Sequence, residues 1–279
     1  MSVDPYNNVA HTPGAAEFPV RWEDEAREYR AIEAALGRAR LNQPYGTHPN
    51  EKFDLFFPNS ARPKGLAVFI HGGYWRRFSR GHFSHFAAGL TGNGWAVAMP
   101  GYPLAPEVKI PQITASVAAS VTAISALLPR LPISLVGHSA GGHLAVRMLD
   151  ETLPIPAEVR ARFQRVMAIS PVTDLRPLLE NQINQILALT PAEAEAESPV
   201  NQPAPALPVH TIVGKSELPA FRDQARWLAE AWPKSRLTEL ENAHHFNALN
   251  FLTEPEHPLT RWLILDEGAE QPNRPAPSA

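Results

Sequence analysis

A serine set between glycines is the strongest chemical signal in this sequence. Residues 137–142 read Gly-His-Ser-Ala-Gly-Gly, which places Ser139 in a G-x-S-x-G pattern. In this pattern the serine stands on a tight turn between a strand and a helix, where small neighbours let the backbone bend. The apolar run 133–136 and the helical run 143–149 supply that context. We therefore predict that Ser139 is a nucleophile for acyl transfer, with the backbone N–H of Ala140 facing the developing oxyanion.

A second glycine motif follows an earlier apolar run. Residues 71–75 read His-Gly-Gly-Tyr-Trp, directly after 65–70. Paired glycines let backbone N–H groups turn toward a substrate oxygen without hindrance from side chains. By position, Gly73 and Tyr74 are the expected donors and Gly72 shapes the turn. This loop and Ala140 together form the predicted oxyanion hole.

The acid of a serine hydrolase of this kind lies between the serine and the histidine in the chain. Glu217 comes just after the apolar run 209–213, at the expected carboxyl end of a strand. Asp223 is the rival, although it falls inside a predicted helix. Asp174 comes one strand too early, and we expect it to cap or brace a loop. Glu217 is therefore the predicted acid.

The base is predicted to be His244 or His245, which follow the last expected strand. Spacing alone does not decide between two adjacent histidines. His138 and His143 flank Ser139 and stand too near it in sequence to reach back over it easily. His71 is expected to brace its own loop through hydrogen bonds.

The elements that must position these residues alternate between strands and helices. Short apolar strands separated by helices predict an α/β fold with a mostly parallel sheet and helices on both faces. Residues 175–207 break the alternation and are read as a small lid-like insertion above the sheet. The predicted strands lie at 51–58, 65–70, 95–99, 133–136, 166–170, 209–213 and 236–240, and the predicted helices at 21–40, 112–130, 144–149, 220–231 and within 247–265.

Length and composition limit the alternatives. The 279 residues suit a single domain over 1–265, with 266–279 expected to be a disordered tail. The net charge of −3 without a basic run makes a nucleic-acid partner unexpected. We expect no secretory signal, because the first residues lack a basic start and an apolar core. No apolar run approaches the ~18 residues of a membrane span, so no membrane association is expected.

Cofactor chemistry finds little support in the sequence. The chain has no cysteine, which excludes disulfides and thiolate ligands and fits a cytoplasmic location. None of its histidines stands in an H-E-x-x-H pattern, and neither G-x-G-x-x-G nor a P-loop is present. We therefore expect neither a metal nor a cofactor. The expected partner is a small-molecule substrate, and a homodimer is an assembly that the sequence allows.

These motifs together resemble the arylformamidase (kynurenine formamidase) branch of the α/β-hydrolases, which is close to the hormone-sensitive-lipase-like esterases. The resemblance covers about 45–265 and is carried by the pieces 45–46, 54–58, 71–75, 101–107, 137–145, 170–175, 245–246 and 253–261. It implies the α/β-hydrolase fold, with Ser139 as nucleophile and oxyanion donors from Gly73, Tyr74 and Ala140. It also favours His245 as base, because the family's histidine directly precedes a phenylalanine. Better-known members carry Asp where Glu217 stands.

The resemblance implies cleavage of an aryl formamide of the N-formylkynurenine type to an arylamine and formate. Tyr74, Trp75 and His138 are then the expected substrate-binding side chains. The alternative is a carboxylesterase, or an amidase or carbamate hydrolase, acting on short-acyl esters or aryl amides with the same groups. A non-catalytic ligand receptor is disfavoured, because serine, acid and histidine candidates are all retained in order.

Overall fold

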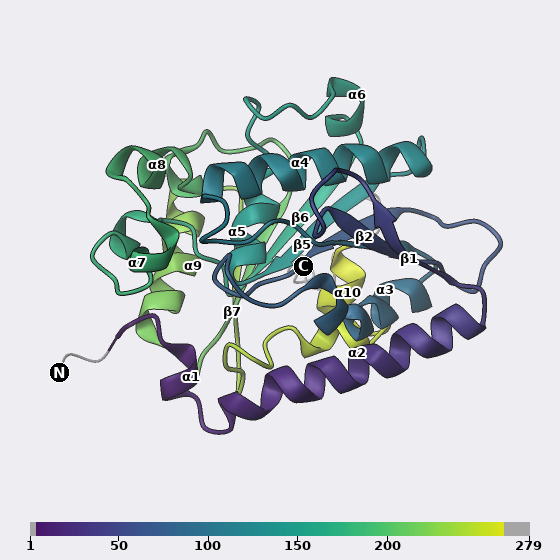
Figure 1. Ribbon diagram of the computed structural model, residues 1–279, viewed down its shortest axis with the longest axis horizontal. Coiled ribbons are helices and arrows are strands. Elements are labelled where there is room, and N and C mark those ends of the chain that lie inside the picture. The colour runs from purple at the N-terminus through teal and green to yellow at the C-terminus, as the bar shows by residue number, and fades with distance from the viewer. Residues whose placement is uncertain (1–3, 265–279) are drawn as a thin grey trace, which may run out of the picture.

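The computed structural model describes residues 4–264, and these contain one eight-stranded sheet (Figure 1). The strand order is β1-β2-β4-β3-β5-β6-β7-β8. The pairs β1–β2 and β2–β4 are antiparallel, and every later pair is parallel. The predicted fold class is confirmed. The strands span Ala39–Pro44 (β1), Lys52–Phe56 (β2), Leu66–Ile70 (β3), Ala96–Pro100 (β4), Ile133–His138 (β5), Phe163–Ile169 (β6), Val209–Gly214 (β7) and Arg236–Leu240 (β8).

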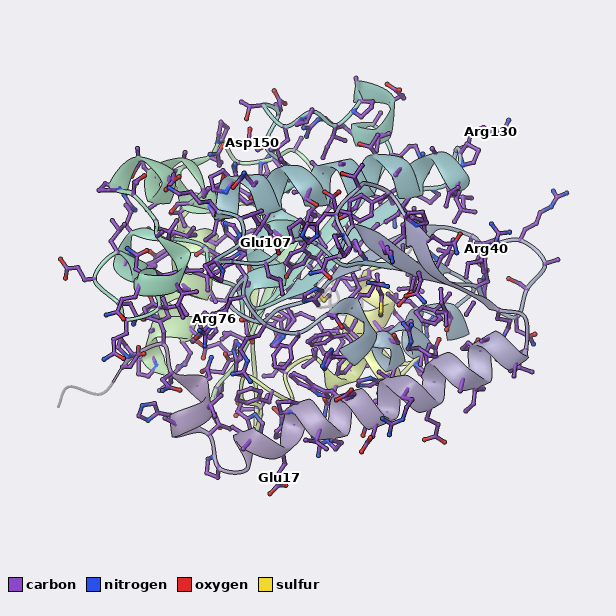
Figure 2. All side chains as sticks on the ribbon, in the orientation of Figure 1. Glu17, Arg40, Arg76, Glu107, Arg130 and Asp150 are labelled. Atoms are coloured by element: carbon purple, nitrogen blue, oxygen red, sulfur yellow. The ribbon has the colours of Figure 1, made fainter. Side chains whose placement is uncertain are left out.

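Helices cover both faces of this sheet. In Figure 1, α4 and α5 lie on one side of the strands, and α2, α3 and α10 lie on the other. Charged side chains such as Glu17 and Arg130 project outward from the molecule (Figure 2). The α-helices span Asn8–His11 (α1), Phe18–Ala35 (α2), Ala88–Gly92 (α3), Ile110–Leu127 (α4), Ala140–Arg147 (α5), Ala157–Arg160 (α6), Asn184–Leu187 (α7), Pro191–Ala196 (α8), Pro219–Ala231 (α9) and Pro258–Trp262 (α10). Short 3-10 turns span Ala15–Glu17 (η1), Arg80–His82 (η2), Ser84–Ala87 (η3), Arg176–Leu178 (η4), Pro199–Asn201 (η5) and Asn250–Thr253 (η6).

Strand β3 shows why the central strands read as unbroken apolar runs. Leu66, Val68 and Ile70 belong to one core cluster, which includes residues of α4, α5 and α9. Ala67 and Phe69 belong to the opposite cluster, which includes residues of α2, α3 and α10. Successive side chains of a strand point to opposite faces, so a strand covered on both sides is apolar at every position.

Two predicted helices differ from the structure. The helix expected over 21–40 ends at Ala35; Gly37, at φ +67°, follows, and 39–44 form the edge strand β1. A glycine in this left-handed region is a common helix stop. The helix expected within 247–265 is two short pieces, η6 and α10; Pro255 lies between them, and Pro258 is the first residue of α10.

Helix α4 corrects the expectation that no apolar run reaches the length of a membrane span. Its 18 residues have a mean hydropathy of 1.4, which suffices by length and composition alone. Ile113, Val117 and Val121 are fully buried in the core beneath it. A helix packed on a sheet has the same apolar composition, and this packing accounts for α4.

The 175–207 insertion contains the short helices η4, α7, α8 and η5 in place of the longer helix-like piece that its first half suggested. The side chain of Asn184 donates a hydrogen bond to the carbonyl oxygen of Leu179 and accepts one from the N–H of Leu189. These two bonds close a compact loop, which takes the place of a longer helix. Whether this insertion acts as a lid stays a prediction. The predicted tail at 266–279 lies outside the described residues.

Candidate active site

Ser139 stands where β5 ends and α5 begins. Its backbone is at φ 56° and ψ −121°, an unfavourable conformation for a residue with a side chain. A Cβ on Gly137 would meet Gly141 O at 2.0 Å, and one on Gly141 would meet Ile70 O at 2.0 Å. The glycines of the motif therefore let strand, turn and helix approach closely enough to hold Ser139 at the sheet's edge.

Glu217 and His245 form a hydrogen-bonded pair close to this edge. Glu217 follows β7, and its Oε2 lies 2.9 Å from Nδ1 of His245. The other carboxylate oxygen, Oε1, accepts hydrogen bonds from Gly214 N–H at 2.7 Å and Ser170 Oγ–H at 2.6 Å. Both side chains are buried. Two donors on one oxygen leave the other free to orient the imidazole.

The alternative residues lie elsewhere. The ring of His244 packs edge-on against Phe18, and its Nδ1 accepts a hydrogen bond from a neighbouring backbone N–H. Asp223 pairs with Arg226 on the surface of α9. Asp174 accepts hydrogen bonds from the backbone and side chain of Arg176, which is the bracing role predicted for it. The structure thus brings Glu217 to His245 and neither rival acid to a histidine.

His138 holds the two halves of the site together. Its Nε2–H donates to the carbonyl oxygen of His245 at 2.8 Å, and the two rings lie 4.8 Å apart. Burial first, and the nearby His245 second, lower the pKa of His138 well below its usual value. The neutral ring fixes the loop after β8 against the serine turn.

The His71–Trp75 loop runs beside Ser139. Gly73 has φ +118°, and Tyr74 has φ +52°. A Cβ on Gly72 would lie 3.0 Å from Cβ of Ser139 and 2.7 Å from His138 O, so only glycine fits there. Within residues 4–264, the backbone N–H groups of Gly72, Gly73 and Tyr74 have no acceptor.

Ala140 adds a further free donor, because the first N–H groups of a helix lack acceptors inside it. His71 braces this loop as predicted. It stacks on Tyr102 at 4.3 Å, and Tyr102 OH donates to the His71 carbonyl oxygen.

The prediction that Trp75 contacts substrate is wrong. Its side chain is fully buried in the core, and its indole N–H donates to Nδ1 of His143 at 3.3 Å. At φ +55°, Trp75 is turned away from the open side of the loop and anchors it from behind. Tyr74, by contrast, borders the cavity, as does His138.

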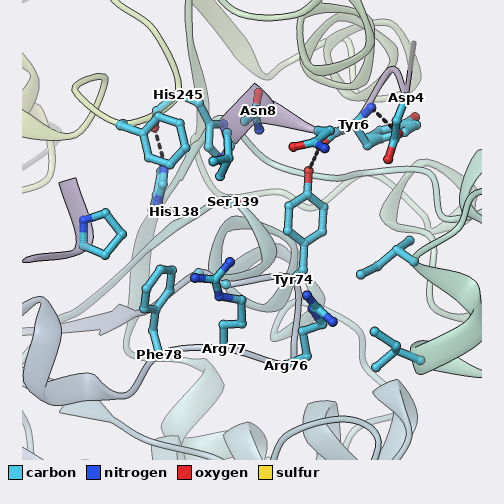
Figure 3. Close-up of a pocket in the computed structure, with 18 of the residues that line it drawn as sticks. Asp4, Tyr6, Asn8, Tyr74, Arg76, Arg77, Phe78, His138, Ser139 and His245 are labelled. Carbon is cyan, nitrogen blue, oxygen red and sulfur yellow. Dashed lines mark hydrogen bonds between the residues drawn. The ribbon is translucent and has the colours of Figure 1, made fainter. Parts of the chain in front are cut away.

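A cavity of about 390 Å³ opens onto these groups (Figure 3). Ser139, His245, His138, Tyr74 and the paired glycines border it. The insertion also contributes, through residues 181–183 and 185–186. The structure therefore gathers the predicted serine, base and oxyanion-loop residues around one hollow, with the acid behind the base.

An N-terminal segment, residues 4–9, also walls the cavity, and no sequence motif predicted this. Its anchor is Tyr6, whose hydroxyl accepts a hydrogen bond from Gln224 at 2.9 Å and whose ring meets Phe221 edge-on. Tyr74 OH donates to the Tyr6 carbonyl oxygen. A lone aromatic residue in a polar stretch was the available signal.

The cavity wall carries charges of both signs. Arg76 and Arg77 border it (Figure 3). Neither forms an ion pair with another residue in 4–264. Asp4 lies on the same wall, where its carboxylate accepts a hydrogen bond from Asn181 at 2.7 Å. In the part of the chain that the structure describes, no cluster of three His, Asp or Glu side chains is placed to hold a metal.

This chain is similar to several known hydrolases. Residues 67–197 match a family described as having the alpha/beta hydrolase fold. The kynurenine formamidase of Danio rerio is 27% identical over 271 residues, which are 88% of this chain and 92% of that protein. The kynurenine formamidase of Salmo salar is 28% identical, covering 82% of each chain.

Solved structures agree on the fold. A protein from Silicibacter sp. TM1040, provisionally described as a thioesterase, is 44% identical with a TM-score of 0.90, covering 94% of this chain and 99% of that one. Esterase B from Lactobacillus rhamnosis has a TM-score of 0.64 at 19% identity, covering 87% of this chain and 92% of that one. The latter likeness concerns the fold alone.

Proposed function

Because this chain belongs to the α/β-hydrolase family and is arylformamidase-like, we propose that it is a serine hydrolase that cleaves an aryl formamide of the N-formylkynurenine type. The products are an arylamine and formate. The observation that carries the proposal is that Ser139 and His245 border one cavity while Glu217 binds Nδ1 of His245. That bond leaves Nε2 as the ring nitrogen available to the serine.

The reaction runs through a formyl-serine intermediate. Oγ of Ser139 attacks the formyl carbon, and Nε2 of His245 takes the hydroxyl proton. The backbone N–H groups of Gly73, Tyr74 and Ala140 stabilise the oxyanion, and one such donor contributes about 3 kcal/mol. The C–N bond then breaks, and His245 protonates the leaving arylamine. Water activated by His245 releases formate and restores Ser139.

The charges on the cavity wall support a substrate with an amino-acid end. N-formylkynurenine carries a carboxylate and an ammonium group at the end remote from its formamide. Arg76 and Arg77 supply cations without an ion-pair partner in 4–264 for the carboxylate, and Asp4 supplies a carboxylate for the ammonium group. Guanidinium groups bind carboxylates well because their paired N–H donors match the two oxygens.

The alternative activity is hydrolysis of short-acyl esters or other aryl amides, and the provisional description of the Silicibacter protein adds thioesters to the substrates worth testing. The serine, base and oxyanion donors would be the same, so substrate comparison decides between them. Purified protein is assayed with N-formylkynurenine, p-nitrophenyl acetate and acetyl-coenzyme A. We expect the highest kcat/KM for the formamide.

Ser139→Ala is the matched control, and it should lower turnover of every substrate by at least about 10⁴-fold. Ester or thioester turnover without formamide turnover would contradict the proposed substrate. Unchanged turnover in Ser139→Ala would contradict the serine mechanism itself.

A further inference from the structure

We propose that Asn8 is a specificity-determining residue that hydrogen-bonds the leaving-group side of an aryl amide substrate. The inference rests on the proposed function and deepens it, because it names substrate groups that the cavity recognises beyond the formyl group. Sequence motifs give no role to Asn8, which lies in the N-terminal segment.

The side chain of Asn8 is buried and has no hydrogen-bond partner among the described residues. Its side chain is only 3% exposed, and within residues 4–264 neither Nδ2 nor Oδ1 has a hydrogen-bond partner. Asn8 nevertheless borders the same cavity as Ser139 and His245 (Figure 3). Buried polar side chains are nearly always paired, since an unpaired amide loses the hydrogen bonds it made with water. A ligand in the cavity can supply the missing partners.

The local structure of the segment does not explain this side chain. The helix cap of α1 is Asn7, whose Oδ1 accepts the Ala10 N–H at 3.1 Å. The segment is docked by Tyr6, through its bonds to Gln224 and Tyr74. Asn8 takes part in the turns only through its backbone N–H and carbonyl. Neighbouring residues therefore place Asn8 at the cavity, and its amide does not hold them.

The hydrogen-bonding groups of the Asn8 amide determine which ligand groups can bind it. Asn8 offers one donor group and one acceptor group, so a matching ligand offers an acceptor and a donor close together. The formyl oxygen of the substrate is taken by the oxyanion donors. On the leaving-group side, an ortho-acyl formanilide still presents its amide N–H and the carbonyl oxygen of its ortho-acyl group. Oδ1 of Asn8 accepts the first, and Nδ2 donates to the second.

Two formyl substrates isolate this contact. N-formyl-2-aminoacetophenone presents both groups, whereas phenyl formate presents neither, and both yield the same formyl-serine. Asn8→Leu keeps the side-chain volume and removes both hydrogen-bonding atoms. We expect it to lower kcat/KM for the formanilide by about 10- to 100-fold. The value for phenyl formate should change by less than about threefold.

Thermal stability separates this role from a structural one. Because Asn8→Leu removes an unpaired buried amide, Tm should be unchanged or higher. His11→Ala, on the exposed end of the same helix and outside the cavity, should leave both rates and Tm unchanged. Asn8→Ala removes the amide without adding apolar bulk, and it should show the same substrate selectivity.

The outcomes distinguish this inference from the proposed function. Equal losses with both substrates, a lower Tm for Asn8→Leu, or a loss seen with leucine and not with alanine would overturn the assignment of Asn8 and leave the formamidase proposal intact. Wild-type turnover of phenyl formate without turnover of the formanilide would overturn the proposed function, and the assignment of Asn8 with it.

Discussion

Glu217 accepts a hydrogen bond from Nδ1 of His245 at 2.9 Å, across 28 residues of chain. The pairing depends on the parallel arrangement of β7 and β8, whose carboxyl ends deliver both residues to one edge of the sheet. Ser170 and Gly214 fix the far oxygen of the carboxylate. Both carboxylate oxygens of Glu217 are therefore held, one by these two donors and the other by His245.

Glu217→Gln should lower kcat by about 10³- to 10⁴-fold with little loss of stability. The glutamine oxygen must face the Gly214 and Ser170 donors, so its NH₂ group faces Nδ1 of His245. That arrangement forces the ring proton onto Nε2, which can then no longer accept the serine proton. Steady-state kinetics measure the loss. Asp223→Asn is the matched control, and an equal loss there would contradict the assignment of the acid.

His245→Gln should abolish turnover, by at least about 10⁴-fold, because it removes the group that takes the serine proton. His244→Gln changes an adjacent residue of the same type whose ring faces Phe18. Its kcat should stay within about threefold of the wild-type value. The two variants are compared under identical conditions, and a reversed order of effects would assign the base to His244.

Gly72→Ala should lower kcat/KM by about 10²-fold or more, because the new methyl group would displace the serine turn and its oxyanion donors. It should also destabilise the fold by about 1–3 kcal/mol, as overpacking does. Gly81→Ala is the matched control, since its nearest neighbour would be an ordinary 3.6 Å away. Equal kinetics for both variants would contradict the close approach of this loop to Ser139.

Stability should fall as pH decreases from about 6.5 toward 4. Burial lowers the pKa of His71 and His210 to about 4 and that of His143 to about 3. The unfolded chain, with ordinary histidines, binds more protons in this range, so acid favours unfolding. Each of these histidines should lower the free energy of unfolding by on the order of 1 kcal/mol at pH 5.

The measurement is Tm across pH 7.5 to 5.0. His210→Gln should flatten the dependence, whereas His11→Gln, at an exposed position, should leave it unchanged. A Tm that does not vary over this range would show that the buried histidines ionise without cost.

Sequence patterns anticipate the parts of this protein whose structure is local. The run 133–136 followed by the Ser139 motif predicts a strand, a turn and a helix, and all three are present. Strand β1 was missed because its sequence is polar; its side chains alternate between half-buried and exposed, as suits a strand at the edge of a sheet. Trp75 was misplaced because a loop motif does not reveal which of its side chains turns inward. The N-terminal wall was missed because its contacts join residues far apart in the sequence, Tyr6 to Tyr74 and Gln224 and Asp4 to Asn181.

The docking of residues 4–9 has a consequence for the order in which the molecule is assembled. Tyr6 meets its partner Gln224 across 218 residues, which is a late contact for a chain that folds as it is synthesised. The strands from β2 to β6 can pair before β7 and α9 have been synthesised. Residues 4–9 cannot dock at the cavity until Gln224 of α9 is present. Recognition of substrate should therefore appear only after α9 has left the ribosome.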